Sequence, residues 1–314
     1  MTLFRVISPG HYTTVQDRGR FDFQHMGVPV SGALDEFAAR VANWLVGNPD
    51  HLAVLEITVI GPELEVQQDA DVALTGAEMK MRINEQEAPS WASCRVRSGD
   101  LIRFDMTTAG CRGYLAVSGG IAVRPVMGSR STYVGGCLGG IGGRTLVADD
   151  MIPRGDSPLL VRPRELPAEW IPACPGQIVL RAIQGPQEDA FVDSLELFFS
   201  TEYKVSPKAD RMGYRLTGPA IQHGPDYPAS IISEPSLPGN VQIPPDGKPI
   251  ILLVEQTTGG YSKIATVISS DIDRVAQALP GNRVRFVQVS LERAHAIYRE
   301  RQQQFEKIET HLNA

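Results

Sequence analysis

The chain has 314 residues and a formal net charge of −6, from 30 lysines and arginines against 36 aspartates and glutamates. With 42% hydrophobic and 21% charged residues it has the composition of a globular protein, and its length is typical of roughly two domains. A mildly acidic chain without a run of basic residues argues against nucleic acid as a partner, because phosphate binding requires clustered lysine and arginine.

The sequence lacks the patterns of exported and membrane-spanning chains. Residues 1–10 contain no basic region followed by an apolar stretch, and the longest strongly apolar run, Ile250–Val254, is far shorter than the roughly 20 residues of a membrane span. The 4 cysteines show no C-x-x-C spacing and the 6 histidines are scattered. We therefore expect a cytoplasmic protein with no membrane partner, no disulfides and no metal.

Short strands dominate the predicted elements. The segments are apolar or alternate between apolar and polar residues, and Gly, Pro, Asn or Asp lie near most of their boundaries. In chain order they are Phe4–Ile7, Leu64–Val66, Val72–Gly76, Met79–Ile83, Leu101–Phe104, Tyr114–Val117, Ile178–Leu180, Ile250–Val254, Ala265–Ile268 and Val284–Val289. Many short strands at near-regular spacing are typical of barrels or sandwiches rather than of a doubly wound sheet.

Helical periodicity is clear in three places. The first helix covers about residues 34–46, where apolar residues form one stripe with a 3.6-residue period before Gly47. The second covers about Asp271–Leu279 and stops at a Pro-Gly pair. The third begins near Ser290 and carries few apolar residues among many charges, which is typical of a surface helix.

The two halves of the chain resemble each other in three short segments. The similar pairs are Phe104–Gly110 with Leu253–Gly259, Gly61–Leu64 with Gly218–Ile221, and Asp17–Gly19 with Asp210–Gly213. We interpret these pairs as an internal repeat of two β-rich halves, residues 1–160 and 176–314. The first helix is then an insertion in the first half, the third helix closes the second half, and a proline-rich linker joins the two.

The strongest candidate for a functional site is the loop Glu255–Lys263, which follows an apolar strand. The loop concentrates different hydrogen-bonding groups, namely those of Gln256, Thr257, Thr258, Tyr261 and Lys263. Lys263 can neutralise a carboxylate or phosphoryl group, and Gln256 can hydrogen-bond an amide. The alternative is a hairpin turn whose polar residues face solvent.

Two Asp-Arg pairs occupy corresponding positions in the repeat. Asp17 and Arg18 lie in a loop that ends in glycine, and Asp210 and Arg211 form a similar loop in the second half. An arginine fork recognises a carboxylate or phosphate at two points, so Arg18 and Arg211 are candidate anion binders. Structural ion pairs are the alternative.

Three further segments carry weaker signals. Pro29–Asp35 resembles a helix start that is capped by Ser31 or Asp35. Gly128–Arg144 is rich in glycine but matches neither a Walker A loop nor a dinucleotide fingerprint, which leaves a lid, a partner-binding loop and an ordinary surface loop open. Gln242 lies between apolar neighbours and either points into a pocket or has a structural role.

Several of these segments together resemble a known family. They are Thr14–Gly19, Gly27–Gly32, Asn43–Asn48, Leu55–Thr58, Gly128–Tyr133, Asp210–Tyr214 and Gln256–Tyr261. They are similar to the allophanate hydrolase subunit 2 family, also called the biotin-dependent carboxyltransferase family, which includes the C subunit of 5-oxoprolinase. The resemblance implies a mostly β fold of two tandem cyclophilin-like β-barrel halves with a few helices.

The resemblance also implies three possible functions. The favoured one is the C subunit of an ATP-dependent 5-oxoprolinase, which opens the lactam of 5-oxoproline to glutamate. Its partners would be a subunit 1-type protein, like the B subunit of 5-oxoprolinase, and a lactam hydrolase like the A subunit, with ATP used at the level of the complex. The alternatives are a carboxyltransferase that moves a carboxyl group from carboxybiotin to urea or a similar amide, and a regulatory module that antagonises a subunit 1-type partner. The absence of a biotin-attachment context and of a biotin carboxylase domain favours the oxoprolinase function.

The hypothesis for the site follows from this function. Lys263, Tyr261 and Gln256 are expected to act as catalytic groups in a cleft, with Arg211 and Asp210 opposite. Lys263 would offset charge on the lactam oxygen, and Gln256 would orient the ring amide. Further substrate contacts are expected from Thr257, Thr258, Gln242, Asp17 and Arg18.

Overall fold

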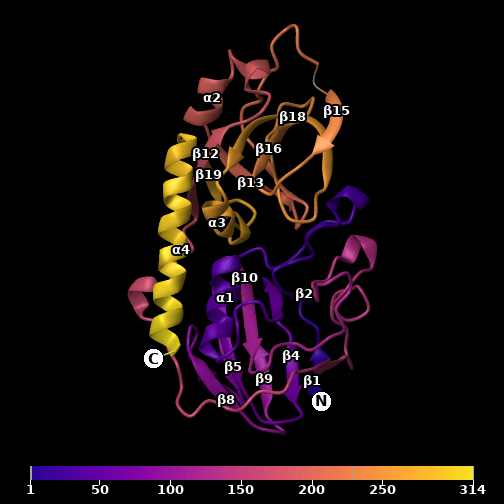
Figure 1. Ribbon diagram of the computed structural model, residues 1–314, viewed down its shortest axis with the longest axis vertical. Coiled ribbons are helices and arrows are strands. Elements are labelled where there is room, and N and C mark those ends of the chain that lie inside the picture. Colours follow the sequence, from indigo (N-terminus) through magenta and orange to yellow (C-terminus); the bar gives the residue numbers. More distant parts are fainter. Residues whose placement is uncertain (1, 229, 314) are drawn as a thin grey trace. The chain divides into compact units, whose positions relative to one another are not determined.

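A computed structural model describes residues 2–228 and 230–313, which form two compact units (Figure 1). Within this range unit 1 comprises residues 2–21, 31–174 and 305–313, and unit 2 comprises residues 22–30, 175–228 and 230–304. Two segments thus depart from the order of the chain, because residues 22–30 belong to unit 2 and the end of the last helix belongs to unit 1. The two successive halves inferred from the repeat, 1–160 and 176–314, stay a prediction.

Unit 1 contains two antiparallel sheets in its described residues. The six-stranded sheet has the order β11-β1-β4-β9-β6-β7, and the five-stranded sheet has the order β2-β3-β10-β5-β8. The strands of the first sheet are β1 (Thr2–Ser8), β4 (Glu63–Val66), β6 (Met81–Ile83), β7 (Gln86–Ala88), β9 (Leu101–Phe104) and β11 (Met151–Pro153). Those of the second are β2 (Tyr12–Gln16), β3 (Val54–Thr58), β5 (Ala70–Glu78), β8 (Ser93–Val96) and β10 (Ala109–Val117).

The five-stranded sheet is buried on both faces. On β10, Leu115 and Val117 belong to the core shared with the six-stranded sheet, whereas Tyr114 and Ala116 belong to a second core. Successive side chains of a strand point to opposite faces, so a single strand contributes to both cores. This explains why the sequence of β10 is apolar over a continuous run rather than alternating.

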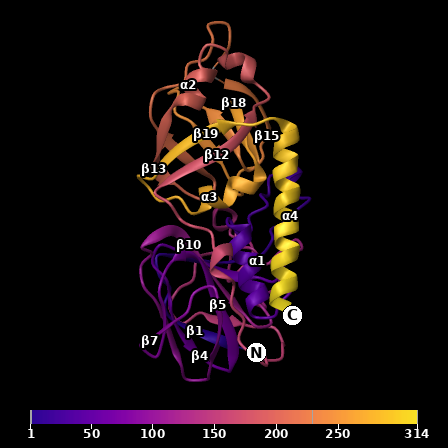
Figure 2. The same cartoon turned by 90° about the vertical axis from the view of Figure 1, so that its left-hand side faces the viewer.

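Helix α1 (Glu36–Leu45) covers the second face of this sheet. Its N-cap is Asp35, whose carboxylate accepts a hydrogen bond from Ala38 N at 2.9 Å. The predicted capping by Asp35 is therefore confirmed, and Ser31 does not fill that role. In both views the lower end of helix α4 (Leu291–Asn313) runs beside α1 (Figures 1 and 2), and the ring of Phe305 lies 5.8 Å from that of Phe37.

Unit 2 is built on a single sheet of eight described strands. Their order is β12-β19-β13-β14-β17-β16-β18-β15, and β18 also pairs with β12. Strand β18 thus pairs back with β12, the first strand in this order. Strand β15 also pairs with β18. The strands are β12 (Gln177–Gln184), β13 (Glu202–Ala209), β14 (Gly213–Thr217), β15 (Ser230–Pro235), β16 (Asn240–Ile243), β17 (Ile250–Leu252), β18 (Thr258–Val267) and β19 (Arg283–Gln288).

The mostly β class with a few helices is confirmed, but one predicted helix is shorter than expected and another helix was not predicted. The segment Asp271–Leu279 forms only a short helix, α3 (Ile272–Ala276), after a 3-10 turn. The carboxylate of Asp271 accepts hydrogen bonds from Arg181 at 2.5 and 2.9 Å, which ties it to β12 rather than to the helix start. Helix α2 (Leu195–Ser200) is missed by the sequence pattern, because its six residues are too short to show a period.

The structure gives no sign of a membrane span or a metal centre in the part of the chain that it describes. None of the helices there combines the length and the apolar character that a span requires. Nor do three or more His, Cys, Asp or Glu side chains gather where they could hold a metal ion among residues 2–228 and 230–313.

The packing of α4 in unit 1 predicts a large effect of truncating Phe305. Its ring is 2% exposed and contacts both Phe37 and Trp44. We expect Phe305→Ala to lower the free energy of unfolding by about 3–5 kcal/mol, through lost burial and the cavity that remains. Urea denaturation followed by circular dichroism measures this effect.

A matched control lies on the same helix. Tyr298 is 50% exposed, so Tyr298→Ala should change the free energy of unfolding by less than about 0.5 kcal/mol. Equal effects of the two substitutions would contradict the packing described for Phe305.

Candidate functional site

A lysine is buried on strand β18, and its charge is paired inside unit 2. Lys263 is 1% exposed, and its Nζ donates to Glu234 Oε1 at 2.5 Å. The side chain of Gln187 donates from Nε2 to the same carboxylate oxygen at 2.9 Å and accepts from Lys263 N at 3.0 Å. A buried ammonium is costly unless it is paired and hydrogen-bonded, and Lys263, Glu234 and Gln187 therefore form one hydrogen-bonded cluster.

Strand pairing brings the segments that carry these residues onto β18. In the β16–β18 pair Gln242 lies opposite Lys263, and in the β15–β18 pair Glu234 lies opposite Gly259. Paired residues of antiparallel strands lie within reach of each other. Gln187 follows β12 and enters from the other side of β18, which pairs with β12 as well. The cluster thus forms where three strands contact β18.

The carboxylate of Glu234 is held in its charged form. The hydrogen bond from Lys263 is the largest cause, and that from Gln187 adds to it; together they lower the pKa of Glu234 below its ordinary value. A carboxylate with a low pKa remains a hydrogen-bond acceptor at neutral pH. Beside it, Lys263 Nζ has one acceptor in the described chain although an ammonium carries three donors.

Two buried polar groups next to this cluster have no hydrogen-bond partner in the described residues. They are Gln242 Nε2 and Ser236 Oγ, on residues that are 4% and 8% exposed. Both lie beside Gly259, since a Cβ added there would be 2.1 Å from Gln242 Nε2 and 3.2 Å from Ser236 Oγ. A Cβ at position 259 would displace the amide end of Gln242, and both unpartnered groups lie next to the same glycine. Buried groups without partners are uncommon and call for an explanation.

Most of the predicted loop Glu255–Lys263 belongs to a strand, which corrects that prediction. Strand β18 begins at Thr258, so only three of the nine residues precede it. Within the turn, Gln256 Nε2 donates to the backbone oxygen of Thr258, and Thr257 O accepts from Ser236 N at 2.9 Å. At Gly259 and Gly260 the missing side chains leave room for groups of neighbouring strands, such as the amide of Gln242 and the hydroxyl groups of Ser233 and Ser236. The predicted role of these residues in a cleft stays a prediction.

The second Asp-Arg pair is divided between surface and interior. Asp210 is exposed, and its Oδ1 accepts from Met212 N and Gly213 N at 2.8 and 3.1 Å, which closes its own turn. Arg211 is buried, and its Nε contacts Glu255 Oε1 at 2.5 Å. Both residues thus make contacts within the chain, and their predicted position opposite Lys263 stays a prediction. Tyr261 is 36% exposed and lies nearer the surface than Lys263.

The first Asp-Arg pair has a structural role in unit 1. Asp17 accepts hydrogen bonds from Ser129 Oγ at 2.6 Å, Ser131 Oγ at 2.5 Å and Arg130 N at 2.6 Å. It thereby anchors the start of the glycine-rich segment Gly128–Arg144. Arg18 is half exposed and lies 3.5 Å from a carboxylate oxygen of Glu36.

Several residues that the structure brings together carry no signal in the sequence. Glu234, Gln187 and Ser236 depend on strand pairing, and no local pattern marks them.

Arg20 is completely buried in unit 1, where it donates to Val126 O at 3.0 Å and Ser131 O at 2.9 Å while its Nη1 has no partner in the described chain. Burial lowers the pKa of its guanidinium. Its one sequence signal is its position after the loop of Asp17.

Comparison with known proteins identifies what this chain is similar to. The family model described as carboxyltransferase domain, subdomain A and B, matches residues 26–288. The chain is 37% identical to the C subunit of 5-oxoprolinase from Escherichia coli K12 over 99% of both chains, and 33% identical to the protein of that name in Haemophilus influenzae over 94% of both. It superimposes on the crystal structure of K. lactis urea amidolyase with a TM-score of 0.92 at 29% identity over 98% of its length, but spans 20% of that protein.

The pairing of Lys263 predicts a stability effect that depends on pH. We expect Glu234→Gln to lower the free energy of unfolding at pH 7 by about 2 kcal/mol, less than for a fully buried pair because the Glu234 side chain is 38% exposed. The pKa of Glu234 is lowered in the folded state, so this stabilisation is present above the ordinary carboxyl pKa and is lost as the pH falls through the lowered value.

Denaturant titrations between pH 3 and pH 7 measure the difference between the two proteins. The pair Lys80–Glu87 is exposed on both sides, so Glu87→Gln is the control and should cost less than about 1 kcal/mol. A difference between wild type and Glu234→Gln that stays constant down to pH 3 would show that the negative charge of Glu234 does not contribute to stability.

Proposed function

The chain belongs to the family of carboxyltransferase domains with subdomains A and B, and on this premise we propose that it is the C subunit of a 5-oxoprolinase. Membership confirms the resemblance inferred from the sequence. The observation that carries the proposal is the 37% identity to the C subunit of the Escherichia coli 5-oxoprolinase, which extends over 99% of both chains. The match to urea amidolyase covers only 20% of that larger protein, so it is the weaker guide to function.

We propose that the complex opens the lactam of 5-oxoproline to glutamate with consumption of ATP. The partners would be a B-like protein, of the subunit 1 type, and an A-like lactam hydrolase. The glycine-rich segment Gly128–Arg144 has no Gly-Lys-Ser/Thr ending and is anchored by Asp17, so it does not fit a phosphate-binding loop. ATP is therefore assigned to the complex, and this chain contributes substrate binding and positioning.

The cluster around Lys263 has the groups that a lactam needs. The carbonyl oxygen and the N–H of a cis amide lie on adjacent edges of the ring, so recognition requires donors and an acceptor side by side. Gln242 Nε2 and Ser236 Oγ are the proposed donors to the oxygen, and the charged carboxylate of Glu234 is the proposed acceptor for the N–H.

Lys263 completes this arrangement electrostatically. When water adds to the carbonyl carbon, negative charge develops on the lactam oxygen, and as the C–N bond breaks a proton from that water passes to the ring nitrogen. A nearby ammonium with donors to spare stabilises that charge far more in a buried site than in water. Gln256 and Tyr261, nearer the surface, are proposed to contact the part of the substrate that faces the partner proteins.

The second candidate function is carboxyl transfer from carboxybiotin to urea or a similar amide. The TM-score of 0.92 with urea amidolyase favours it. Urea presents the same carbonyl and N–H groups as a lactam, so the cluster would bind either. Biotin would be the cofactor under this alternative alone, and the assay below separates the two.

A reconstitution assay tests the proposal. The chain is combined with its A-like and B-like partners, and ADP release that depends on 5-oxoproline is measured. We expect Gln242→Leu to lower kcat/KM by about 10²-fold, since it removes a donor to the developing oxyanion. Lys263→Ala should reduce turnover at least as much.

Gln303→Leu is the matched control, because Gln303 is exposed on helix α4 and should leave turnover unchanged. Full turnover of Lys263→Ala in an intact complex would remove Lys263 from the mechanism. Turnover that requires urea and biotin instead of 5-oxoproline would establish the carboxyltransferase alternative.

A further inference from the structure

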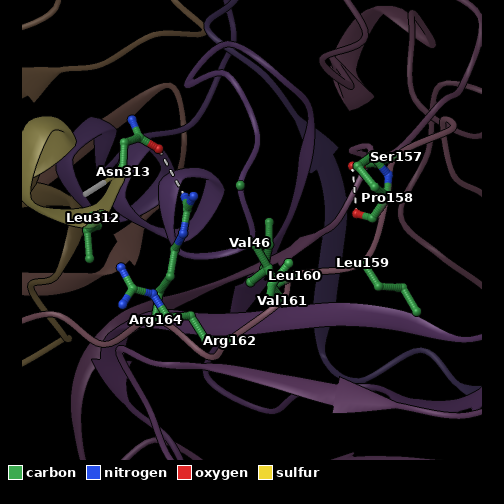
Figure 3. Close-up of a pocket in the computed structure, with 11 residues that line it drawn as sticks. Val46, Ser157, Pro158, Leu159, Leu160, Val161, Arg162, Arg164, Leu312 and Asn313 are labelled. Carbon is green, nitrogen blue, oxygen red and sulfur yellow. Dashed lines mark hydrogen bonds between the residues drawn. The ribbon is translucent and has the colours of Figure 1, made fainter.

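A pocket of about 400 Å³ lies in unit 1, on elements that the proposed lactam site does not use (Figure 3). Its wall is formed by the end of helix α1, the segment 157–164 and the last turn of helix α4. A volume of this size is typical of sites for small molecules. The pocket is therefore a candidate site for a small molecule that is separate from the proposed lactam site.

Two arginines line this pocket without a carboxylate partner among the described residues. Neither Arg162 nor Arg164 makes an ion pair with any residue that the structure describes. Burial, and after it the positive charge of Arg162, lowers the pKa of the Arg164 guanidinium, so the two charges are close enough to repel each other. An anion between them would remove this repulsion.

The guanidinium of Arg164 is held by one of its three nitrogens. Nη1 donates to Trp44 O at 2.7 Å and to Asn313 Oδ1 at 3.1 Å, the second of which is drawn in Figure 3. Nε and Nη2 have no acceptor in the described chain, and they form the edge of the fork that a carboxylate binds at two points. The arginine is thus fixed in place while this edge stays available.

Apolar side chains make up much of the remaining lining, with Ser157 and Asn313 as polar members. Val46, Leu160 and Leu312 contribute its apolar wall. The backbone of Leu160 is held at both ends, since its N donates to Asp71 Oδ2 at 2.6 Å and its O accepts from Arg95 Nη2 at 2.7 Å. A rigid wall binds a ligand without a large ordering cost.

We propose that this pocket binds a small carboxylate with an apolar body, whose carboxylate lies between Arg162 and Arg164 and whose body packs against Leu160. The inference does not depend on the lactam site or on the activity of the complex. Arg162 is the better residue for a test, because it is exposed and its side chain donates no hydrogen bond within the described chain, whereas Arg164 also holds the end of α1.

The probe is hexanoate, and binding to the full chain is measured by isothermal titration and by the shift of Tm. We expect hexanoate to bind at least about 10-fold more tightly than 1-hexanol, which lacks the charge, and more tightly than acetate, which lacks the apolar body. Arg162→Gln should weaken hexanoate binding about 10-fold and leave the Tm of the free protein unchanged.

Arg299→Gln is the control, since Arg299 is exposed on helix α4 in unit 2 and should bind hexanoate like the wild type. Equal affinities for hexanoate and 1-hexanol, or an affinity that Arg162→Gln leaves unchanged, would overturn the arginine site. Glutamate binding more tightly than hexanoate would overturn the apolar part of the proposal.

Discussion

The need to pair a buried charge organises the interior of unit 2. Lys263 lies on β18 at 1% exposure, and its charge is paired with Glu234 of the neighbouring strand β15. Gln187 belongs to the same network because it bonds to both residues. One ion pair thus joins three segments that are distant in the sequence. The unpartnered groups of Gln242 and Ser236 lie next to this network.

The family and the fold class could be predicted from the sequence because both depend on local patterns. The stripe of α1, its cap at Asp35 and the strand Leu101–Phe104 are all local features, and the structure has them. The proposed lactam site could be anticipated only in part. Lys263 was predicted as part of a polar loop and Gln242 as a polar residue between apolar neighbours, but Glu234 and Ser236 come from a segment without any pattern. Which of them meet is decided by strand pairing, and a register cannot be read from one strand alone.

The Asp-Arg motif shows how similar sequences can take different roles. Asp17 accepts from Gly19 N, and Asp210 accepts from Met212 N, so each carboxylate closes a turn onto the residue two positions later. The arginines differ, because Arg18 is half exposed whereas Arg211 is buried against Glu255. The similarity between the segments therefore reflects a shared turn, and the anion binding expected of Arg18 and Arg211 stays a prediction.

The position of Phe305 has a consequence for how the protein is made. The apolar stripe of α1 is covered in part by Phe305, Ile308 and Leu312, which the ribosome adds after all of unit 2. Until then the stripe of the nascent chain remains without this cover, and exposed apolar surface of this kind promotes aggregation. Unit 1 is thus the first of the two units to begin and the last to be completed.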